Sequence, residues 1–187
     1  VLNIVSAIAA FERTLISTNS PFDRFERGDS SALSPSAQNG YAMFFSERLE
    51  CFHCHGGFNF SDGVTHTGQT ISELAFHNTG LYNVDARGSY PNEDTGLFEI
   101  TQNPRDMGRF RSPTLRNIEV TGPYMHDGSL ATLEEVLAHY EAGGQTILEG
   151  PNAGVGSESP LKNAFIHGFE LTPQERADVL AFLRSLT

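Results

Sequence analysis

The sequence predicts one mostly α-helical domain with long loops over residues 1–187. Helical periodicity and capping residues mark four segments as helices. Between residues 56 and 113, the chain is rich in Gly, Asn, Asp, Thr and Pro and shows no strand-like alternation. No internal repeat divides the chain, whose length fits one domain or one half of a two-domain protein.

The first two helices are predicted in the N-terminal quarter. Apolar residues recur at spacings of three and four across residues 1–17, with no N-cap residue before them. A turn-rich loop, SPFDRFERGDSSALS, follows this segment. Ser34 then caps a second helix at residues 35–48, with Pro35 at its first position. We expect this helix to run straight into LECFHCHGG, residues 49–57.

Two further helices are predicted near the C-terminal end. Thr132 and Glu135 form a capping box before the segment LEEVLAHYEA, and Gly143 supplies a stop. A loop rich in Gly and Pro over residues 149–160 leads to the last helix, TPQERADVLAFLRSL. Thr172 is its expected N-cap, and Pro173 occupies its first position.

Composition narrows the function classes. The formal net charge of −11 argues against a nucleic-acid partner, which needs clustered Lys and Arg. This negative charge is compatible with solubility alone and also with electrostatic attraction of basic partner proteins. No apolar run is long enough for a membrane span. Trp is absent, so a Trp-based electron relay would have to come from elsewhere.

Both cysteines lie in the motif C-x-x-C-H at residues 51–55. A zinc site would need further ligands at defined spacing, and a thioredoxin-like pair would need a βαβ setting. Neither pattern surrounds this motif. The remaining chemistry is covalent haem attachment, for which C-x-x-C-H is the signature. A structural disulfide with an incidental histidine is the alternative.

The spacing suits haem attachment physically. A separation of three places Cys51 and Cys54 on one face of a helix, where both thiols can form thioethers with the haem vinyl groups. The next residue, His55, is then expected to bind the haem iron as the proximal ligand. His53, inside the motif, is expected to be a solvent-side spacer.

A larger resemblance rests on segments that occur in order along the chain. They are AAFERTLISTNSPFDRFERGD, AQNGYAMFFSERLECFHCHGGFNFSD, FHNTGLYN, FRSPTLRNIEVTGPYMHDGSLATLEEVLAHYEAGG and LTPQERADVLAFLRSL. Together they resemble the C-terminal half of the bacterial diheme cytochrome c peroxidase family, including its MauG-type branch. The resemblance implies a cytochrome c-like domain that carries an electron-relay haem. By the same resemblance, the peroxide-reactive haem belongs to an N-terminal domain that is cleaved, supplied as another chain or not part of this protein.

The resemblance also implies a second axial ligand. From chemistry alone, Met43, Met107, Met125 and the other histidines compete for this role. Aligned with the family, the axial position falls on Tyr140. Peroxidases proper carry Met at this position, whereas the MauG-type branch carries Tyr. A tyrosinate favours ferric and higher states, whereas a thioether raises the haem potential.

Other site residues are implied by the same resemblance. Family members bind Ca²⁺ between the two haems, and the backbone carbonyls of Thr121 and Pro123 would contribute here. Arg111 and Arg116 would meet the haem propionates. His77 and His126 are expected to be hydrogen-bonded structural residues.

The resemblance implies an oxidoreductase that uses hydrogen peroxide, with one haem c on this chain and two in the intact protein, plus Ca²⁺. Because covalent haem attachment occurs outside the cytoplasm, we expect a periplasmic protein. No catalytic residue is assigned within this chain. Its partners would be the N-terminal haem domain or chain and either a protein substrate or an electron donor, a cytochrome or cupredoxin. The alternatives are a non-catalytic electron-transfer cytochrome c and an ordinary cytochrome c peroxidase with a Met-ligated haem.

Overall fold

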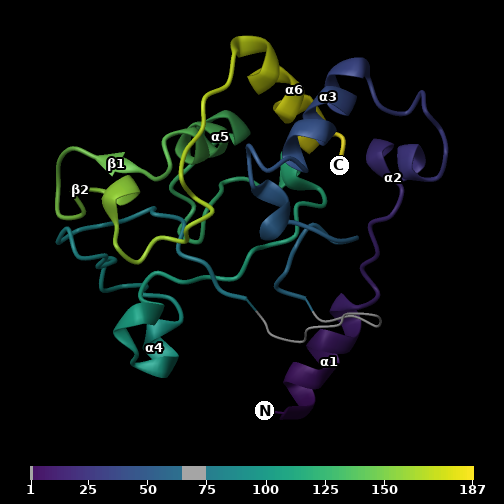
Figure 1. Ribbon diagram of the computed structural model, residues 1–187. Coiled ribbons are helices and arrows are strands. Elements are labelled where there is room, and N and C mark those ends of the chain that lie inside the picture. Colours follow the sequence, from purple (N-terminus) through teal and green to yellow (C-terminus); the bar gives the residue numbers. More distant parts are fainter. Residues whose placement is uncertain (1, 65–74) are drawn as a thin grey trace.

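The computed structural model describes residues 2–64 and 75–187, which are mostly helices and loops with very little sheet (Figure 1). The α-helices are α1 (Leu2–Glu12), α2 (Pro21–Glu26), α3 (Pro35–Phe44), α4 (Phe98–Thr101), α5 (Leu133–Glu141) and α6 (Pro173–Arg184). Short 3₁₀ helices are η1 (Cys51–His53), η2 (Pro104–Asp106), η3 (Ile118–Val120) and η4 (Gly156–Glu158). Strands β1 (Thr146–Ile147) and β2 (Gly154–Val155) form a small antiparallel hairpin.

The predicted helix caps are confirmed. The side chains of Ser34, Thr132 and Thr172 each accept a hydrogen bond from the backbone N–H three residues on, at 3.1 to 3.2 Å. Such caps satisfy N–H groups that the first helical turn leaves without partners. Helix α5 also ends as predicted, because Gly143 adopts a positive φ of 69° and its N–H donates to the carbonyl of Tyr140. This geometry is a Schellman ending.

Two helix boundaries were wrong. The first helix stops at Glu12 and does not reach residue 17. Near its end, the Thr14 hydroxyl donates to the Phe11 carbonyl at 2.7 Å and so competes with the helical backbone for this acceptor. Val1, the predicted start, lies outside the described residues. The helix predicted to reach the C-x-x-C-H motif ends at Phe44, where the Ser46 hydroxyl bonds the Met43 carbonyl at 2.6 Å.

The apolar core lies between α3 and α6, which pack together at the top of Figure 1. Gly40 allows their close approach, because a Cβ there would collide with the backbone of Asp178 and the Cβ of Phe182. The Phe182 side chain is fully buried, and its ring centroid lies 5.1 Å from that of Phe44. Phe22 and Phe60 complete this aromatic cluster.

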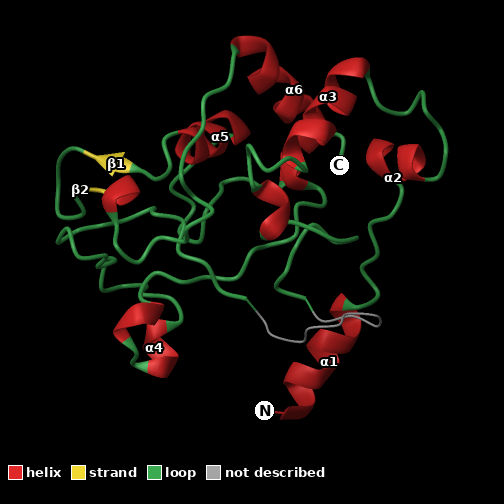
Figure 2. Ribbon diagram, viewed as in Figure 1, coloured by secondary structure: helices red, strands yellow, loops and turns green. Residues whose placement is uncertain are grey.

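Loops make up most of the remaining structure (Figure 2). Buried polar side chains organise them. Asn78, which is 1% exposed, donates to the Met107 carbonyl and accepts from both the Gly80 N–H and the Tyr90 hydroxyl. Asn83 links its loop to β2 by donating to the Val155 carbonyl at 2.8 Å. Amide side chains here replace the backbone ladder that a sheet would provide.

Helix α1 lies apart from the core, on the opposite side of the molecule from α6 in Figure 1. None of its residues is buried. Large apolar side chains on and just after it are more than half exposed: Leu2, Ile4, Val5, Ile8, Phe11, Leu15 and Ile16. None of the helices in the described chain combines the length and apolar content needed to cross a bilayer.

Candidate functional site

The two cysteines lie at the entry of a tight turn rather than on a long helix. Glu50 adopts a left-handed conformation, with φ of 59°, and η1 follows at once. Both cysteines are free thiols, Cys51 partly exposed and Cys54 buried. Burial raises the pKa of each thiol to about 12. Protonated thiols are poor nucleophiles, so this environment does not favour thiol redox catalysis.

His55 is oriented by the backbone. Its Nδ1 lies 3.2 Å from the carbonyl oxygen of Phe60. A carbonyl only accepts hydrogen bonds, so Nδ1 carries the proton and Nε2 keeps its lone pair. Burial lowers the pKa of His55, which keeps the ring neutral. A neutral imidazole held through Nδ1 is the form in which histidine ligates a metal.

Tyr140 lies near the cysteine motif. Burial raises the pKa of its phenol, and the neighbouring thiols of Cys54 and Cys51 raise it further. The phenol of Tyr140 therefore lies close enough to the two thiols to be influenced by them electrostatically. Its helix, α5, is fixed at both ends by the capping box and the Schellman ending.

The methionines are placed differently from Tyr140. Met43 packs against the apolar core, which is the ordinary use of a buried methionine. Met107 is partly exposed in a loop, where its backbone carbonyl accepts from Asn78. Met125 is partly exposed in the turn before α5, with a positive φ of 69°.

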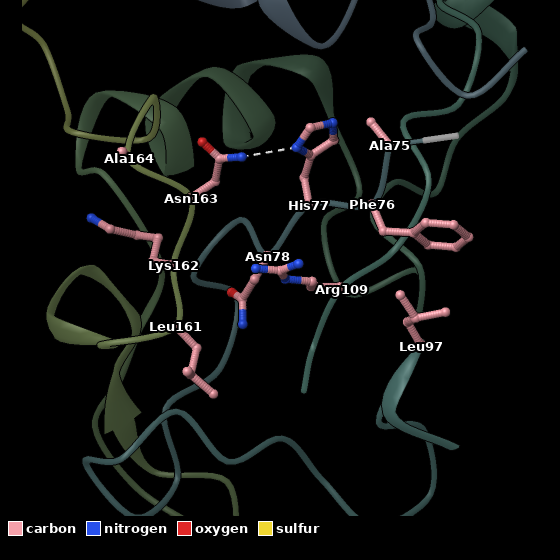
Figure 3. Close-up of a pocket in the computed structure, with 10 residues that line it drawn as sticks. All are labelled: Ala75, Phe76, His77, Asn78, Leu97, Arg109, Leu161, Lys162, Asn163 and Ala164. Atoms are coloured by element: carbon pink, nitrogen blue, oxygen red, sulfur yellow. Dashed lines mark hydrogen bonds between the residues drawn. The ribbon is translucent and has the colours of Figure 1, made fainter. Parts of the chain in front are cut away.

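A cavity of about 560 Å³ lies between the loops that carry His77 and Asn163 (Figure 3). His77 is part of its wall, and the ligand atoms of His77, Cys54 and Asp62 lie within 4.8 Å of one another. A pair of adjacent thiols and a neutral histidine held through Nδ1 fit covalently attached haem.

Cys54, Asp62 and His77 form a cluster with residue types that also occur in zinc sites. His77 is already engaged on both nitrogens, since Nε2 lies 2.6 Å from Asp62 and Nδ1 lies 2.8 Å from the Asn163 amide nitrogen. Cys51 belongs to neither of the two groups of potential metal ligands found among the described residues. A structural zinc site built on C-x-x-C would use both sulfurs, so the arrangement favours haem.

The two arginines predicted for the propionates differ. Arg116 binds Asp23 through Nη1 at 2.9 Å and the Phe58 carbonyl through Nε at 3.0 Å. The guanidinium N–H groups of Arg116 are therefore used in hydrogen bonds within the protein. Arg111 is exposed and stands 5.3 Å from the ring centroid of Phe76.

Two other histidines have clear packing roles. His53 is more than a spacer, because its ring stacks on Phe165 at 4.1 Å and its Nε2 lies 2.6 Å from a Glu50 carboxylate oxygen. His126 stacks on Phe110 at 3.8 Å.

Thr121 and Pro123 lie together in an exposed turn. The turn leads into Tyr124, whose hydroxyl bonds the Ile118 carbonyl at 2.7 Å. The assignment of a calcium ion to the carbonyls of Thr121 and Pro123 stays a prediction.

Sequence reasoning missed several cavity residues, including Asn78, Arg109, Lys162 and Asn163. Arg109 stands only two residues before Arg111, but nothing in the local pattern GRFR shows which arginine faces the cavity. The others come from loops far apart in sequence. Only the folded chain brings them together.

Comparison with known proteins decides the family. A sequence profile for di-haem cytochrome c peroxidase matches residues 1–31. Cytochrome-c peroxidase IdrP1 of Denitromonas iodatirespirans is 37% identical, over 97% of this chain and 49% of its own length. The methylamine utilization protein MauG of Methylorubrum extorquens is 33% identical, over 98% of this chain and 44% of its own length. The chain belongs to the diheme cytochrome c peroxidase/MauG family.

Solved structures agree with this membership. A MauG-like protein associated with microbial copper homeostasis superposes with a TM-score of 0.92, at 49% identity, over 98% of this chain and 52% of that one. The diheme peroxidase BthA of Burkholderia thailandensis shares the fold, with a TM-score of 0.59 at 19% identity. The chain thus spans about half the length of the family members that it matches.

Proposed function

We propose that this chain is the electron-relay half of a periplasmic diheme peroxidase of the MauG type, with His55 and Tyr140 as the axial ligands of its haem. The observation that supports the proposal is the proximity of Tyr140 to the thiols of Cys51 and Cys54, next to which His55 presents a neutral ring. Four residues with the chemistry of a c-type haem site come from two elements far apart in sequence. Family membership supports haem as their common ligand.

Each residue has a distinct task. Cys51 and Cys54 would hold the haem through thioethers, and the Phe60 carbonyl holds the His55 ring in the tautomer that presents Nε2. A bound c-type haem supplies one-electron chemistry. Tyr140 contributes a phenol that burial keeps protonated until a cation is adjacent. Beside a ferric ion, the phenolate form of Tyr140 would be favoured, and this hard anion would stabilise the oxidised state.

The partner in this proposal is the second haem domain, which completes the peroxidase. Helix α1 supplies an apolar surface for it, since several large side chains are exposed there. Hydrogen peroxide would react at the partner haem, and this chain would pass electrons or oxidising equivalents to or from an external donor or protein substrate. Thr121 and Pro123 would provide carbonyl ligands to a calcium ion shared with that domain.

Covalent attachment is tested first. The wild-type protein should retain a haem stain on a denaturing gel, and the mass of the chain should exceed its sequence mass by one haem. Cys51→Ala and Cys54→Ala together should abolish both signals. A wild-type mass without this increment would sink the proposed function.

The distal ligand is tested by a matched pair of variants. Tyr140→Phe should change the ferric spectrum and abolish the sharing of oxidising equivalents with the second haem, because the ligand oxygen is removed. Met125→Leu should preserve the spectrum and cost only packing. A thioether–iron absorption band in the wild type, lost in Met125→Leu, would instead assign an ordinary Met-ligated peroxidase relay.

Catalysis and calcium are tested on the full-length protein. Peroxide turnover distinguishes a peroxidase from a non-catalytic electron-transfer cytochrome. Exhaustive chelation should lower this turnover and weaken coupling between the haems. Unchanged turnover and coupling after chelation would remove the calcium assignment while leaving the haem assignment in place.

A further inference from the structure

We propose that Arg87 and Arg105 form a docking pocket for an acidic segment of a partner protein and bind one Asp or Glu carboxylate of that segment. In the proposed function, this partner is the external protein with which the chain exchanges electrons. The inference rests on the proposed function for that identity alone. The pocket itself is a feature of the loops around η2.

The pocket is small and has both charged and apolar walls. Its volume is about 210 Å³. Arg87, Ser89 and Arg105 supply polar groups, whereas Pro104, Met107 and Leu161 supply apolar surface. Sites for whole small molecules usually measure about 300–1,000 Å³. This pocket therefore suits a single inserted side chain better than a whole ligand.

The guanidinium groups of Arg87 and Arg105 have no partner within the described part of the chain. Both side chains are exposed, and only the backbone N–H groups of these residues are hydrogen-bonded. Most other cations contact a carboxylate, an oxygen of the backbone or an aromatic ring: Arg24, Arg27, Arg48, Arg109, Arg111, Arg116, Lys162, Arg176 and Arg184. The chain carries 23 acidic residues against 12 basic ones, so carboxylate partners are plentiful. Two unpaired arginines in one pocket are therefore unusual for this protein.

The carboxylates nearest in sequence are used for other bonds. Asp85 accepts from the Arg87 N–H at 2.8 Å and from the Ser89 hydroxyl at 2.8 Å. Asp106 accepts from the Thr101 hydroxyl at 2.9 Å and has Arg109 as its cationic neighbour. These bonds fix the backbone beside each arginine and leave both guanidinium groups available to a carboxylate from outside the chain.

The two segments that carry the arginines are held in place around Leu161. Gly88 has a positive φ of 97°, and its N–H donates to the Asn83 side chain at 2.8 Å. A Cβ at Gly88 would lie 2.7 Å from Cγ of Leu161, so this loop packs directly against that side chain. On the other side, the Asn103 side chain accepts from the Arg105 N–H at 3.1 Å and caps η2.

The chemistry of the pocket favours a carboxylate side chain over an inorganic anion. A guanidinium group binds a carboxylate through two parallel N–H···O bonds. The apolar wall can contact the CH₂ groups of a glutamate, whereas phosphate has no apolar surface to bury. On a chain with a formal charge of −11, two free arginines also mark one location for an acidic segment, and the remaining acidic surface repels it. The pocket would thus set the position of the partner more than the overall affinity.

The test measures peptide binding to the full-length, haem-loaded protein by fluorescence anisotropy. The probe is a fluorescein-labelled hexaglutamate peptide, and hexaglutamine with the same label is the control. An ionic strength of about 0.15 M limits electrostatic effects to roughly 8 Å, which reduces repulsion by distant acidic residues. The variants are Arg87→Gln, Arg105→Gln, the double variant, Arg105→Lys and Arg13→Gln. Arg13 is the matched control, because it is also exposed and without a side-chain partner in the described chain but lies just after α1.

Hexaglutamate should bind the wild type more tightly than hexaglutamine does. Arg87→Gln and Arg105→Gln should each weaken binding about three- to tenfold, and Arg13→Gln by less than about twofold. Arg105→Lys keeps the charge and should lose less than Arg105→Gln. Equal binding of the two peptides, an unchanged affinity in the double variant, or an equal loss in Arg13→Gln would overturn the proposal.

Two further outcomes separate the alternatives. Complete displacement of hexaglutamate by inorganic phosphate at the same concentration would also overturn the proposal, in favour of a site for free anions. Haem staining of the same samples tests the proposed function separately. Selective peptide binding by a wild-type chain without covalent haem would support the pocket and refute the proposed function.

Discussion

The two halves of this molecule are stabilised in different ways. In the helical half, built from α2, α3 and α6, aromatic and aliphatic side chains fill a continuous core. In the loop half, residues 75–113 and 143–166, buried Asn and Tyr side chains bond directly to the backbone of distant segments. Leu81 and Tyr90 are buried there, outside the main apolar cluster.

The two kinds of stabilisation differ in how specifically they constrain the sequence. Apolar packing tolerates exchange among side chains of similar volume. A buried amide network does not, because each group needs a partner at the right distance and angle. The cavity lies against the loop half, where Asn78 and Asn163 belong to its wall. The loop half therefore tolerates fewer substitutions than the helical half, and its amide network gives the cavity wall a defined shape.

The largest effect is expected from the centre of the helical half. Phe182→Ala should lower the free energy of unfolding by about 3–5 kcal/mol, because the fully buried ring leaves a cavity. Phe182→Leu should cost far less. Urea denaturation of both variants measures the difference. Equal losses for Ala and Leu would show that this core requires an aromatic ring and is not generic.

The next effect is expected from the amide network. Asn78→Ala should cost about 3 kcal/mol, since it leaves the Met107 carbonyl and the Gly80 N–H without their bonds. Asn78→Leu should cost at least as much despite its greater apolarity. Asn92→Ala, at an exposed position, is the control and should be near neutral. Stabilisation by Asn78→Leu would erase the proposed distinction between the halves.

A buried ion pair links α2 to the segment before η3, and its contribution to stability should depend on pH. Arg116 and Asp23 are each 11% exposed in their side chains. Burial raises the pKa of Asp23, but hydrogen bonds from Ser20 and Arg116 outweigh it and hold the pKa below its ordinary value. Asp23→Asn should therefore cost about 2 kcal/mol at neutral pH.

Because the folded pKa is depressed, the stabilisation by Asp23 is present above its unfolded pKa and is lost as pH falls below about 4. Unfolding measured between pH 7 and pH 3 should converge for wild type and Asp23→Asn. A double-mutant cycle with Arg116→Gln isolates the pair. A constant gap between the two proteins across this range would contradict the assignment.

The smallest effect is expected at the surface of the helical half. Arg184 pairs with Glu134 and Glu119, but all three side chains are 45% to 50% exposed. Arg184→Gln should cost less than about 1 kcal/mol and even less at high salt. A larger loss in calorimetry would mean that surface charges contribute substantially to the helical half.

Features with a local physical cause were predictable from sequence. Ser34, Thr132 and Thr172 cap helices because side-chain oxygen, backbone N–H and apolar periodicity all lie within one turn. Gly143 ends α5 because glycine readily adopts positive φ. The C-x-x-C-H motif is also local, and its spacing alone indicated haem.

Long-range pairings were not predictable in this way. The Asn163 amide meets His77 across 86 residues, and Arg116 meets Asp23 across 93. Nothing near Arg116 in the sequence signals that its charge is satisfied by α2. The end of α3 was also missed, because the Ser46 side chain competes for the backbone within a segment of otherwise helical character. The cavity wall depends on such pairings, which explains why Arg109 and Lys162 were not foreseen.

Helix α1 has a consequence for how assembly can be observed. An isolated helix of 11 residues is marginally stable in water, and α1 buries none of its own side chains. Its backbone amides should exchange with deuterium readily in this chain alone and become protected once a partner covers the apolar face. The rate of deuterium exchange at the α1 amides would therefore report association with a partner, and this measurement does not depend on haem spectroscopy.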